Sequence, residues 1–288
     1  MILIADGGST KCDWILLDSE GEQILKTRTK GLNPAVFKTE VLETRLLENE
    51  DLLAVKDKVH RVHFFGAGCG TPVPTALLKS ILSNFFTEAT EVLVKEDMVA
   101  AVYAATTEPG IVCILGTGSN SCFFDGKTIK TAVDSLGYIL MDEASGNYFG
   151  KRLIRDYYYK TMPQELAEVF QTKYDLSSDV IKENLYKKEN PNTYLASFAE
   201  FIFTNERNGY FYTLISEGMK NFIEHRVLCF KEAQNVPVHF IGSIAYFSQD
   251  IIRDVAKPYH LEIGNFVQRP IDGLLAYYRK EVLGVSEK

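Results

Sequence analysis

One supersecondary unit occurs twice in this 288-residue sequence, and the repetition constrains the fold more than any other feature. In each copy an apolar run ends in a glycine loop, a second run follows, and an Asp/Gly turn leads into a third run. The first copy has its runs at residues 2–5, 13–17 and 24–29, with loops at 6–10 and 18–21. The second copy has its runs at residues 110–115, 121–124 and 128–132, with loops at 116–120 and 125–127. The repeat predicts two related α/β domains that each present one glycine loop, although two unrelated hairpins would give the same pattern.

The segments between and after the two copies alternate between strand and helix patterns. Before residue 108 we expect helices at 39–48, 75–88 and 97–106, and strands at 62–66 and 91–95. After it we expect helices at 146–159, 164–174, 180–187, 193–203, 210–231, 246–257 and 271–282, and strands at 238–241 and 261–263. This order is typical of a layered α/β fold. We expect an N-terminal lobe at 1–108 and a C-terminal lobe at 109–288, with 271–284 a candidate to pack back on the first lobe.

Composition and charge exclude several classes of protein. The sequence has 46% hydrophobic and 24% charged residues, which excludes disordered and fibrous chains. A net charge of −7 gives no basic footprint for nucleic acid and argues against an anionic membrane surface. The first apolar run is interrupted by Asp6, and no stretch approaches the roughly 18 apolar residues of a membrane span. We therefore expect no signal peptide, no membrane partner and no nucleic-acid partner.

The cysteines indicate a reducing compartment. There are five of them, an odd number, and no two have the CxxC spacing of a redox or zinc motif. They are Cys12, Cys69, Cys113, Cys122 and Cys229. We interpret them as reduced, mostly buried thiols of a cytoplasmic protein, without a zinc site or an iron–sulfur cluster.

The two glycine loops have the chemistry of phosphate binding. Residues 7–11 read Gly-Gly-Ser-Thr-Lys, and residues 116–120 read Gly-Thr-Gly-Ser-Asn. Glycine lets a backbone approach a ligand closely, and successive N–H groups can surround an anion. Neither loop is a P-loop or a Rossmann fingerprint. One such hairpin alone is usually only a turn, but two at matching positions of a repeat favour a clamp that grips phosphate from both sides.

Several polar residues next to these loops are candidates for chemistry, and each has a plainer alternative. Asp6 could hold Mg²⁺ against a phosphate or form an Asx turn, and Lys11 could add charge near the phosphates or be solvated. Asp97 follows a strand and opens an apolar helix, so it is either a general base or a helix-capping acid. Asp142 stands at another helix entrance as a capping acid or a ligand of sugar hydroxyls. Asn33 could bond a substrate hydroxyl or form an Asn-Pro turn.

Three motifs, in this order and spacing, carry a resemblance to a known family over nearly the whole chain. They are Asp-Gly-Gly-Ser-Thr-Lys at 6–11, Gly-Thr-Gly-Ser-Asn at 116–120, and the strand at 238–241 that ends in Gly242 and Ser243. The sequence resembles the acetate and sugar kinase/Hsp70/actin superfamily. Within it the sequence is similar to the BadF/BadG-type ATPase family, in the branch of N-acetylglucosamine kinases.

The resemblance implies two ribonuclease H-like lobes of the actin/hexokinase type around a central nucleotide cleft, with ATP and Mg²⁺ as cofactors. It implies that Asp6 positions the metal and that Asp97 is the catalytic base. The implied nucleotide-binding residues are Gly8, Ser9, Thr10, Lys11, Gly116, Thr117, Gly118, Ser119, Gly242 and Ser243. The implied sugar-binding residues are Asn33, Asp97, Ser135, Leu136, Gly137 and Asp142.

One stretch departs from the family pattern, which is roughly G-x-G-x-x-x-G-D-E-G-S. Residues 135–145 read Ser-Leu-Gly-Tyr-Ile-Leu-Met-Asp-Glu-Ala-Ser, so Met141 and Ala144 replace two of the glycines. Their side chains could narrow or reshape the sugar pocket. Membership of the family survives this change, but the exact substrate is left open.

The function that the resemblance implies is ATP-dependent phosphorylation of a sugar hydroxyl, with N-acetylglucosamine or a related amino sugar as the leading candidate. It is also compatible with a homodimer. Two alternatives stay open at this point. One is an ATPase that drives a conformational change in a partner protein, and the other is a non-catalytic sugar-sensing module on the same fold.

Overall fold

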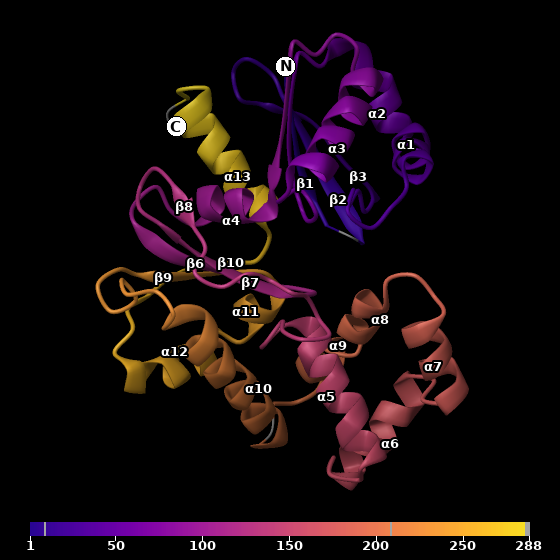
Figure 1. Cartoon of the computed structure of the whole chain (residues 1–288), viewed down its shortest axis with the longest axis vertical. Helices are drawn as coiled ribbons and strands as arrows, with labels where there is room; N and C mark the ends of the chain where they lie inside the picture. Colours follow the sequence, from indigo (N-terminus) through magenta and orange to yellow (C-terminus); the bar gives the residue numbers. More distant parts are fainter. Residues whose placement is uncertain (9, 208, 286–288) are drawn as a thin grey trace. The chain divides into compact units, whose positions relative to one another are not determined.

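A computed structural model describes residues 1–8, 10–207 and 209–285. The chain divides into two compact units (Figure 1). Unit 1 contains Met1–Thr107 and Arg269–Lys288, and unit 2 contains Glu108–Gln268. The last segment of the chain is therefore part of the first unit. In the described part of the chain, no helix is both long and apolar enough to cross a bilayer.

Unit 1 is a five-stranded mixed sheet with helices on both faces. The strands are β1 (Ile2–Gly7), β2 (Lys11–Leu17), β3 (Gln23–Lys30), β4 (Arg61–Gly66) and β5 (Glu91–Glu96), in the order β3-β2-β1-β4-β5. The helices are α1 (Thr39–Leu47), α2 (Glu50–Val55), α3 (Pro72–Phe85), α4 (Asp97–Ala105) and α13 (Pro270–Tyr277), with a 3₁₀ turn at Lys56–Lys58 and a π-helical end at Tyr278–Val282. The first three strands are antiparallel neighbours, whereas β1, β4 and β5 run parallel.

Alternation along the strands builds two apolar layers in unit 1. Leu3, Trp14 and Phe64 lie on the face that packs against residues of α1 and α3. Ile4 and Phe65 belong to the opposite face, which α4 and α13 cover. Because successive strand side chains point to opposite faces, both faces of the central strands must be apolar when helices cover both.

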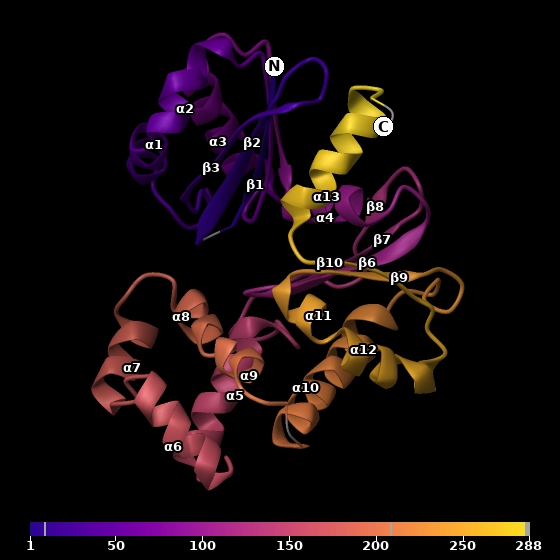
Figure 2. The same ribbon diagram turned by 180° about the vertical axis from the view of Figure 1, so that it is seen from behind.

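Unit 2 repeats the strand order of unit 1. Its strands are β6 (Gly110–Leu115), β7 (Ser119–Phe124), β8 (Ile129–Lys130), β9 (Val238–Ile241) and β10 (Ile263–Val267), in the order β10-β9-β6-β7-β8. Its helices are α5 (Gly146–Tyr158), α6 (Gln164–Lys173), α7 (Ser178–Tyr186), α8 (Pro191–Ser197), α9 (Glu200–Thr204), α10 (Gly209–Phe222), α11 (Ser243–Phe247) and α12 (Gln249–Ala256), with a π-helical turn at Ile223–Val227 and a 3₁₀ turn at Lys257–Tyr259. Figure 2 shows these elements from behind. β6, β7 and β8 correspond to β1, β2 and β3, so the strand repeat that the sequence predicts is correct.

Some predicted elements have different bounds for local physical reasons. The helix expected at 193–203 is two short helices, because the N–H groups of Phe198 and Phe201 bond the carbonyls three residues earlier and tighten the chain. The helix expected at 246–257 starts earlier, at Ser243, and breaks at the buried Ser248. The helix expected at 210–231 is α-helical only to Phe222.

Two further differences concern short elements. Helix α2 was not predicted, although Asn49 is a typical N-cap residue in the sequence. In the structure its side chain accepts a hydrogen bond from the Leu52 N–H at 2.8 Å. The strand expected at 261–263 lies later, as β10, with a bulge at Gly264 and Asn265. The bulge wraps the buried ring of His239, whose Nδ1 accepts a hydrogen bond from the Asn265 N–H at 3.0 Å. That tertiary contact leaves no local trace in the sequence.

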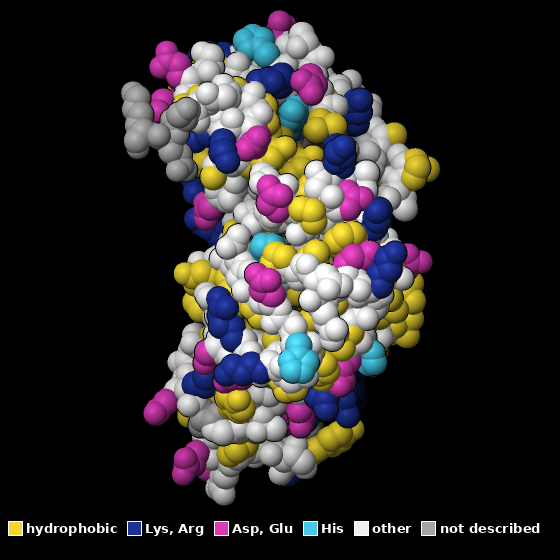
Figure 3. All heavy atoms as spheres, turned by 90° about the vertical axis from the view of Figure 1, so that its left-hand side faces the viewer, with side chains coloured by type: hydrophobic (Ala, Val, Ile, Leu, Met, Phe, Trp, Pro, Cys, Tyr) yellow, Lys and Arg dark blue, Asp and Glu magenta, His cyan; other side chains and the backbone are white. Residues whose placement is uncertain are grey.

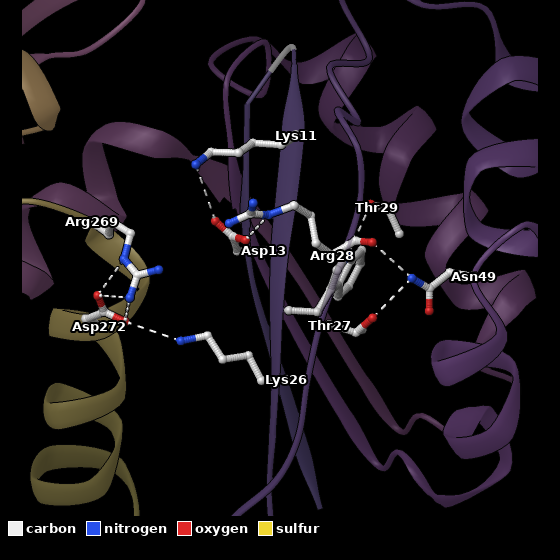
Figure 4. A network of polar contacts seen from close by, with 10 residues as sticks. Lys11, Asp13, Lys26, Thr27, Arg28, Thr29, Asn49, Arg269 and Asp272 are labelled. Atoms are coloured by element: carbon white, nitrogen blue, oxygen red, sulfur yellow. Dashed lines mark hydrogen bonds and ion pairs between the residues drawn. The ribbon is translucent and has the colours of Figure 1, made fainter. Parts of the chain in front are cut away.

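The surface carries both signs of charge. Figure 3 shows one face on which Lys and Arg side chains are interspersed with Asp and Glu. Close pairs of opposite charge in unit 1 include Arg28 with Asp13 on neighbouring strands, and Lys26 of β3 with Asp272 of α13 (Figure 4). The second pair ties the returning helix α13 to the edge of the sheet, but at 3.7 Å and with both side chains partly exposed it adds little stability.

A buried histidine also ties the end of the chain to the central strands. His63 of β4 lies 2.6 Å by its Nδ1 from the Tyr278 hydroxyl and 3.1 Å by its Nε2 from Glu91. A carboxylate only accepts, so Nε2 donates to Glu91 and Nδ1 accepts from Tyr278. Burial lowers the pKa of His63, and Arg61 and Lys95 act in the same direction, whereas Glu91 opposes them.

This arrangement predicts a pH-dependent stability. Unfolded His63 takes up a proton near its ordinary pKa of 6.5, and folded His63 resists protonation until lower pH. Its contribution is therefore present above about pH 6.5 and is lost as the pH falls below that value. We expect the stability difference between wild type and His63→Gln to shrink from pH 7.5 to pH 5. Urea unfolding followed by the fluorescence of Trp14, the single tryptophan and a core residue of unit 1, measures it. A difference that stays constant over this range would contradict the assignment.

Candidate functional site

The first glycine loop joins β1 to β2 and is fastened to the segment that carries Asn33. The Gly8 N–H donates to the Lys11 carbonyl at 2.8 Å, and the N–H groups of Gly31 and Leu32 donate to the carbonyls of Thr10 and Gly8. Thr10 is exposed, and the predicted ligand Ser9 lies outside the described residues. The loop and the start of the next segment are therefore one hydrogen-bonded structure.

Lys11 points toward the carboxylate of Asp13, with 3.9 Å between Nζ and Oδ2 (Figure 4). Arg28 makes the closer bond to Asp13, at 2.6 Å from its Nε. Because Arg28 already compensates Asp13, the half-exposed ammonium of Lys11 is not needed there for charge balance. It remains a candidate for binding an anion at the loop.

Asp6 and Asp97 lie at the carboxyl ends of β1 and β5 and interact electrostatically. Burial raises the pKa of Asp6 to about 7, and the carboxylates of Asp97, Asp13 and Asp272 add to the rise while Lys11 opposes it. Burial and the neighbouring Glu96 raise the pKa of Asp97 to about 6, against backbone N–H groups that lower it. Two carboxyl groups with raised pKa values at the same edge of a sheet are typical of a functional site.

The residues near Asp6 fit a magnesium ion that takes most of its ligands from substrate and water. In the described part of the chain, no group of three or more His, Cys, Asp and Glu side chains is arranged to hold a metal. Mg²⁺ commonly binds proteins through one or two carboxylates and takes its other ligands from substrate phosphates and water. The negative field around Asp6 suits such an ion, since a cation there would relieve the repulsion that adds to the effect of burial on the pKa of Asp6.

The loop after β4 packs against both Asn33 and Glu96. Gly68, at φ 80°, packs so closely on Asn33 that a Cβ would lie 2.0 Å from Asn33 Oδ1. At Gly70 a Cβ would lie 3.0 Å from Glu96 Oε1. Asn33 is buried, and its Oδ1 accepts a hydrogen bond from the Ala35 N–H at 2.9 Å. Burial, Asp97 and Glu96 raise the pKa of Cys69 in this loop to about 12.

Sequence reasoning missed this loop and Glu96. The signal was present, because Gly66 ends a predicted strand and Gly68 and Gly70 follow directly after it. Spacing alone could not show that the loop supports Asn33 or that it approaches the start of α4. Unit 1 thus brings together three of the predicted site residues, namely Asp6, Asn33 and Asp97, around two glycine-rich loops.

The second glycine loop joins β6 to β7 and packs on the start of α5. The N–H groups of Gly146 and Asn147 donate to the carbonyls of Gly116 and Thr117, at 2.8 and 3.0 Å. The Ser119 N–H donates to a carboxylate oxygen of Asp142 at 3.2 Å. Asp142 is buried and lies against the loop rather than in solvent.

The predicted adenosine residues lie next to this loop. Gly242 follows β9 at φ 109°, and a Cβ on it would lie 2.3 Å from the Leu115 carbonyl oxygen and 3.2 Å from the Gly116 nitrogen. Ser243 is exposed and begins α11. The parallel pairing of β6 with β9 produces this proximity, since both strands end at the same sheet edge.

The predicted sugar-binding stretch is an exposed turn of unit 2. Ser135 and Leu136 are exposed, and Gly137 has φ 78° with its carbonyl accepting hydrogen bonds from Leu140 and Met141. The Met141 sulfur accepts a hydrogen bond from the Leu136 N–H at 3.4 Å. Ala144, where the family pattern has glycine, has φ 56° and is buried. Met141 therefore shapes the turn itself, whereas Ala144 lies beneath it in the core.

The contact between Gly68 and Asn33 generates a stability prediction. Gly68→Ala should destabilise unit 1 more than Gly21→Ala, because both positions have nearly the same φ but only Gly68 has a rigid neighbour. Both variants share the cost of a left-handed alanine, about 1 kcal/mol, and the clash at Gly68 should add about 1–3 kcal/mol. Urea unfolding followed by Trp14 fluorescence measures both. Adding Asn33→Ala to Gly68→Ala should remove part of the extra cost, and purely additive effects would refute the clash.

Comparison with known proteins shows which family the chain belongs to. No family model and no curated protein matches the sequence. Two solved structures named "Putative N-acetylglucosamine Kinase" resemble this one. The protein from Porphyromonas gingivalis is 37% identical, with a TM-score of 0.91, over 98% of this chain and 100% of its own. The protein from Chromobacterium violaceum is 13% identical, with a TM-score of 0.71, over 96% of this chain and 98% of its own.

A ROK family glucokinase from Streptomyces griseus, solved with glucose and AMPPNP, shares the fold. It is 14% identical, with a TM-score of 0.59, over 96% of this chain and 97% of its own. These likenesses confirm the two-lobed α/β fold of the actin/hexokinase type that the sequence predicts. By its identity to the Porphyromonas gingivalis protein over nearly the full length of both chains, this chain belongs to the same family, the N-acetylglucosamine kinase-like proteins of the actin-like sugar kinase superfamily.

Proposed function

We propose that this protein is an ATP-dependent kinase that phosphorylates a hydroxyl group of N-acetylglucosamine or a related amino sugar. The family assignment supports this activity. The observation that carries it is the position of Asp97, half-buried at the first residue of α4, beside Glu96 and the loop that packs on Asn33. With a pKa near 6, Asp97 is mostly a carboxylate at neutral pH and still basic enough to accept a proton.

The mechanism assigned to these residues is direct transfer. Asn33 binds and orients the sugar, and Asp97 accepts the proton of the attacking hydroxyl as its oxygen bonds to the γ-phosphorus of ATP. The bond between that phosphorus and the bridging oxygen breaks, and ADP leaves. Ser135, Leu136 and Gly137 are proposed to complete sugar recognition, with the turn that Met141 shapes as the element that sets which amino sugar is accepted.

The nucleotide is proposed to bind through both glycine loops. Gly8, Thr10 and Lys11 of unit 1, together with residues 116–119 of unit 2, would contact the phosphates, and Gly242 and Ser243 the adenosine. Asp6 would hold Mg²⁺, which supplies positive charge against the phosphates. Exclusion of water matters here, because water competes with the sugar as the phosphoryl acceptor.

The hairpin motifs also support placing the chain in the BadF/BadG-type branch of the superfamily. No disulfide joins the five cysteines, of which four are buried and Cys229 is exposed. A reducing cytoplasm is proposed as the location of the protein, from the odd number and scattered positions of its cysteines.

Replacement of Asp97 tests the proposed base. We expect Asp97→Asn to lower kcat by about 10²- to 10⁴-fold, because the amide cannot accept the proton, with little change in the KM for ATP. Coupled ADP release with N-acetylglucosamine measures the rate, and mass spectrometry identifies the phosphorylated sugar. Asp57→Asn, the same substitution at an exposed site of unit 1, should leave the rate unchanged. Full turnover in Asp97→Asn would exclude Asp97 as the base.

The acceptor screen separates the three functions. ADP release that depends on an added amino sugar supports the kinase. Hydrolysis of ATP that no sugar stimulates favours the partner-driving ATPase, and sugar binding without turnover favours the sensor. Amino sugars, hexoses and anhydro-muramic sugars are the acceptors to compare.

A further inference from the structure

We propose that Asp142 and Asn147 are positioning residues that hold the second glycine loop in its phosphate-binding conformation. The inference rests on the proposed function, because it assigns the loop at residues 116–119 to the nucleotide. It adds to the sugar-binding role that the family resemblance implies for Asp142. The contacts that carry it all lie within unit 2.

The carbonyl groups of the loop are fixed by the start of α5. Gly116 and Thr117 each receive a backbone N–H from α5, and the Asn147 side-chain amide donates a further hydrogen bond to the Thr117 carbonyl at 2.8 Å. The first free N–H groups of the helix are thereby used by the loop. Two consecutive peptide groups of the loop thus have their carbonyls directed at α5.

The N–H groups of the same peptides consequently point the other way. In a trans peptide the C=O and the following N–H are antiparallel, so the N–H groups of Thr117 and Gly118 face away from α5. Neither N–H makes a hydrogen bond to any described residue. A Cβ built on Gly116 would meet nothing within 4 Å, so one side of the loop is open. Two adjacent, outward N–H groups beside open space form an anion-binding nest.

Asp142 completes the arrangement by bonding both the loop and the start of α5. Its Oδ1 accepts the Ser119 N–H, and its Oδ2 accepts the Asn147 side-chain amide at 2.8 Å. A Cβ on Gly118 would lie 2.8 Å from Oδ2, so only glycine allows this approach. Both carboxylate oxygens are therefore directed at the loop and at α5. Asn147 uses its two amide hydrogens to bridge Asp142 and Thr117.

One buried hydroxyl at the loop points to a ligand. Ser119 Oγ has no hydrogen-bond partner among the described residues, although the side chain of Ser119 is more than nine-tenths buried. Buried polar atoms in folded proteins usually have a partner. A bound phosphate group is of the right chemistry for the Ser119 hydroxyl, which can donate to it.

The test measures nucleotide and sugar binding separately. In Asp142→Asn the amide oxygen can still accept the Ser119 N–H, but its NH₂ opposes the NH₂ of Asn147 and breaks the bridge to Thr117. Asp142→Gly removes the whole side chain and tolerates φ 70° without strain. We expect both variants, and Asn147→Ala, to weaken binding of AMPPNP with Mg²⁺ by about tenfold to a hundredfold. Asn147→Ala should change binding of N-acetylglucosamine little, because among the described residues the Asn147 side chain bonds only the loop and Asp142.

Asp134→Asn is the matched control, because it removes a carboxylate from an exposed residue of the segment that leads to Asp142. It should bind AMPPNP as the wild type does. Calorimetry gives both dissociation constants, and thermal unfolding confirms that each variant is folded. If Asp142→Gly does not fold, Asp142→Asn and Asn147→Ala decide.

The outcomes distinguish this inference from the proposed function. Weakened sugar binding with unchanged AMPPNP binding would overturn the inference and leave Asp142 as a sugar ligand alone. Unchanged binding of both ligands in all three variants would also overturn it. A wild type that binds AMPPNP but phosphorylates no sugar would overturn the proposed kinase alone, and a wild type that binds no AMPPNP would overturn both.

Discussion

The rest of the structure depends on one parallel strand pair in each unit. These pairs are β1 with β4 in unit 1 and β6 with β9 in unit 2. They place Gly7 opposite Gly66 in unit 1 and Ile114 opposite Ile241 in unit 2. Both loops of each pair therefore leave the sheet at the same edge. In α/β sheets this edge, at the carboxyl ends of the strands, is where ligands bind. Each unit thus carries its polar loops at one end and keeps its apolar side chains in the layers behind them.

The two units use this edge for different chemistry. Unit 1 gathers carboxyl groups at this edge. Burial, and then repulsion from neighbouring carboxylates, raises the pKa values of Asp6 and Asp97, and this environment suits a cation and a proton acceptor. Unit 2 gathers backbone N–H groups, and its buried carboxylate Asp142 bonds the second glycine loop. An acidic protein can bind an anionic nucleotide in this way, because local N–H groups and a bound cation outweigh the net charge.

Much of the fold was predictable because its signals are local. Apolar alternation and glycine punctuation gave the strands of both hairpins, and their repetition gave two units with one strand order. The errors came where tertiary contacts overrode local preference. Packing divided the helix near Phe198, and the ring of His239 moved the last strand toward the C-terminus. The candidate positions Asp6, Asn33 and Asp97 were also visible, since each follows or precedes a recognisable loop or strand end.

The sequence by itself determined the repeat, the strand and loop pattern, and the motifs that indicate a nucleotide-dependent sugar kinase. It could not decide what each polar group faces, because that depends on residues distant along the chain. Only the tertiary structure decided that Gly68 packs on Asn33 and that Glu96 neighbours the same loop. It also turned Asp142 toward the second glycine loop, through Asn147 and Ser119. A carboxylate next to a helix start gives the same sequence pattern whether it caps the helix, binds a ligand or holds a loop. Its role depends on which donors the fold brings within hydrogen-bond distance.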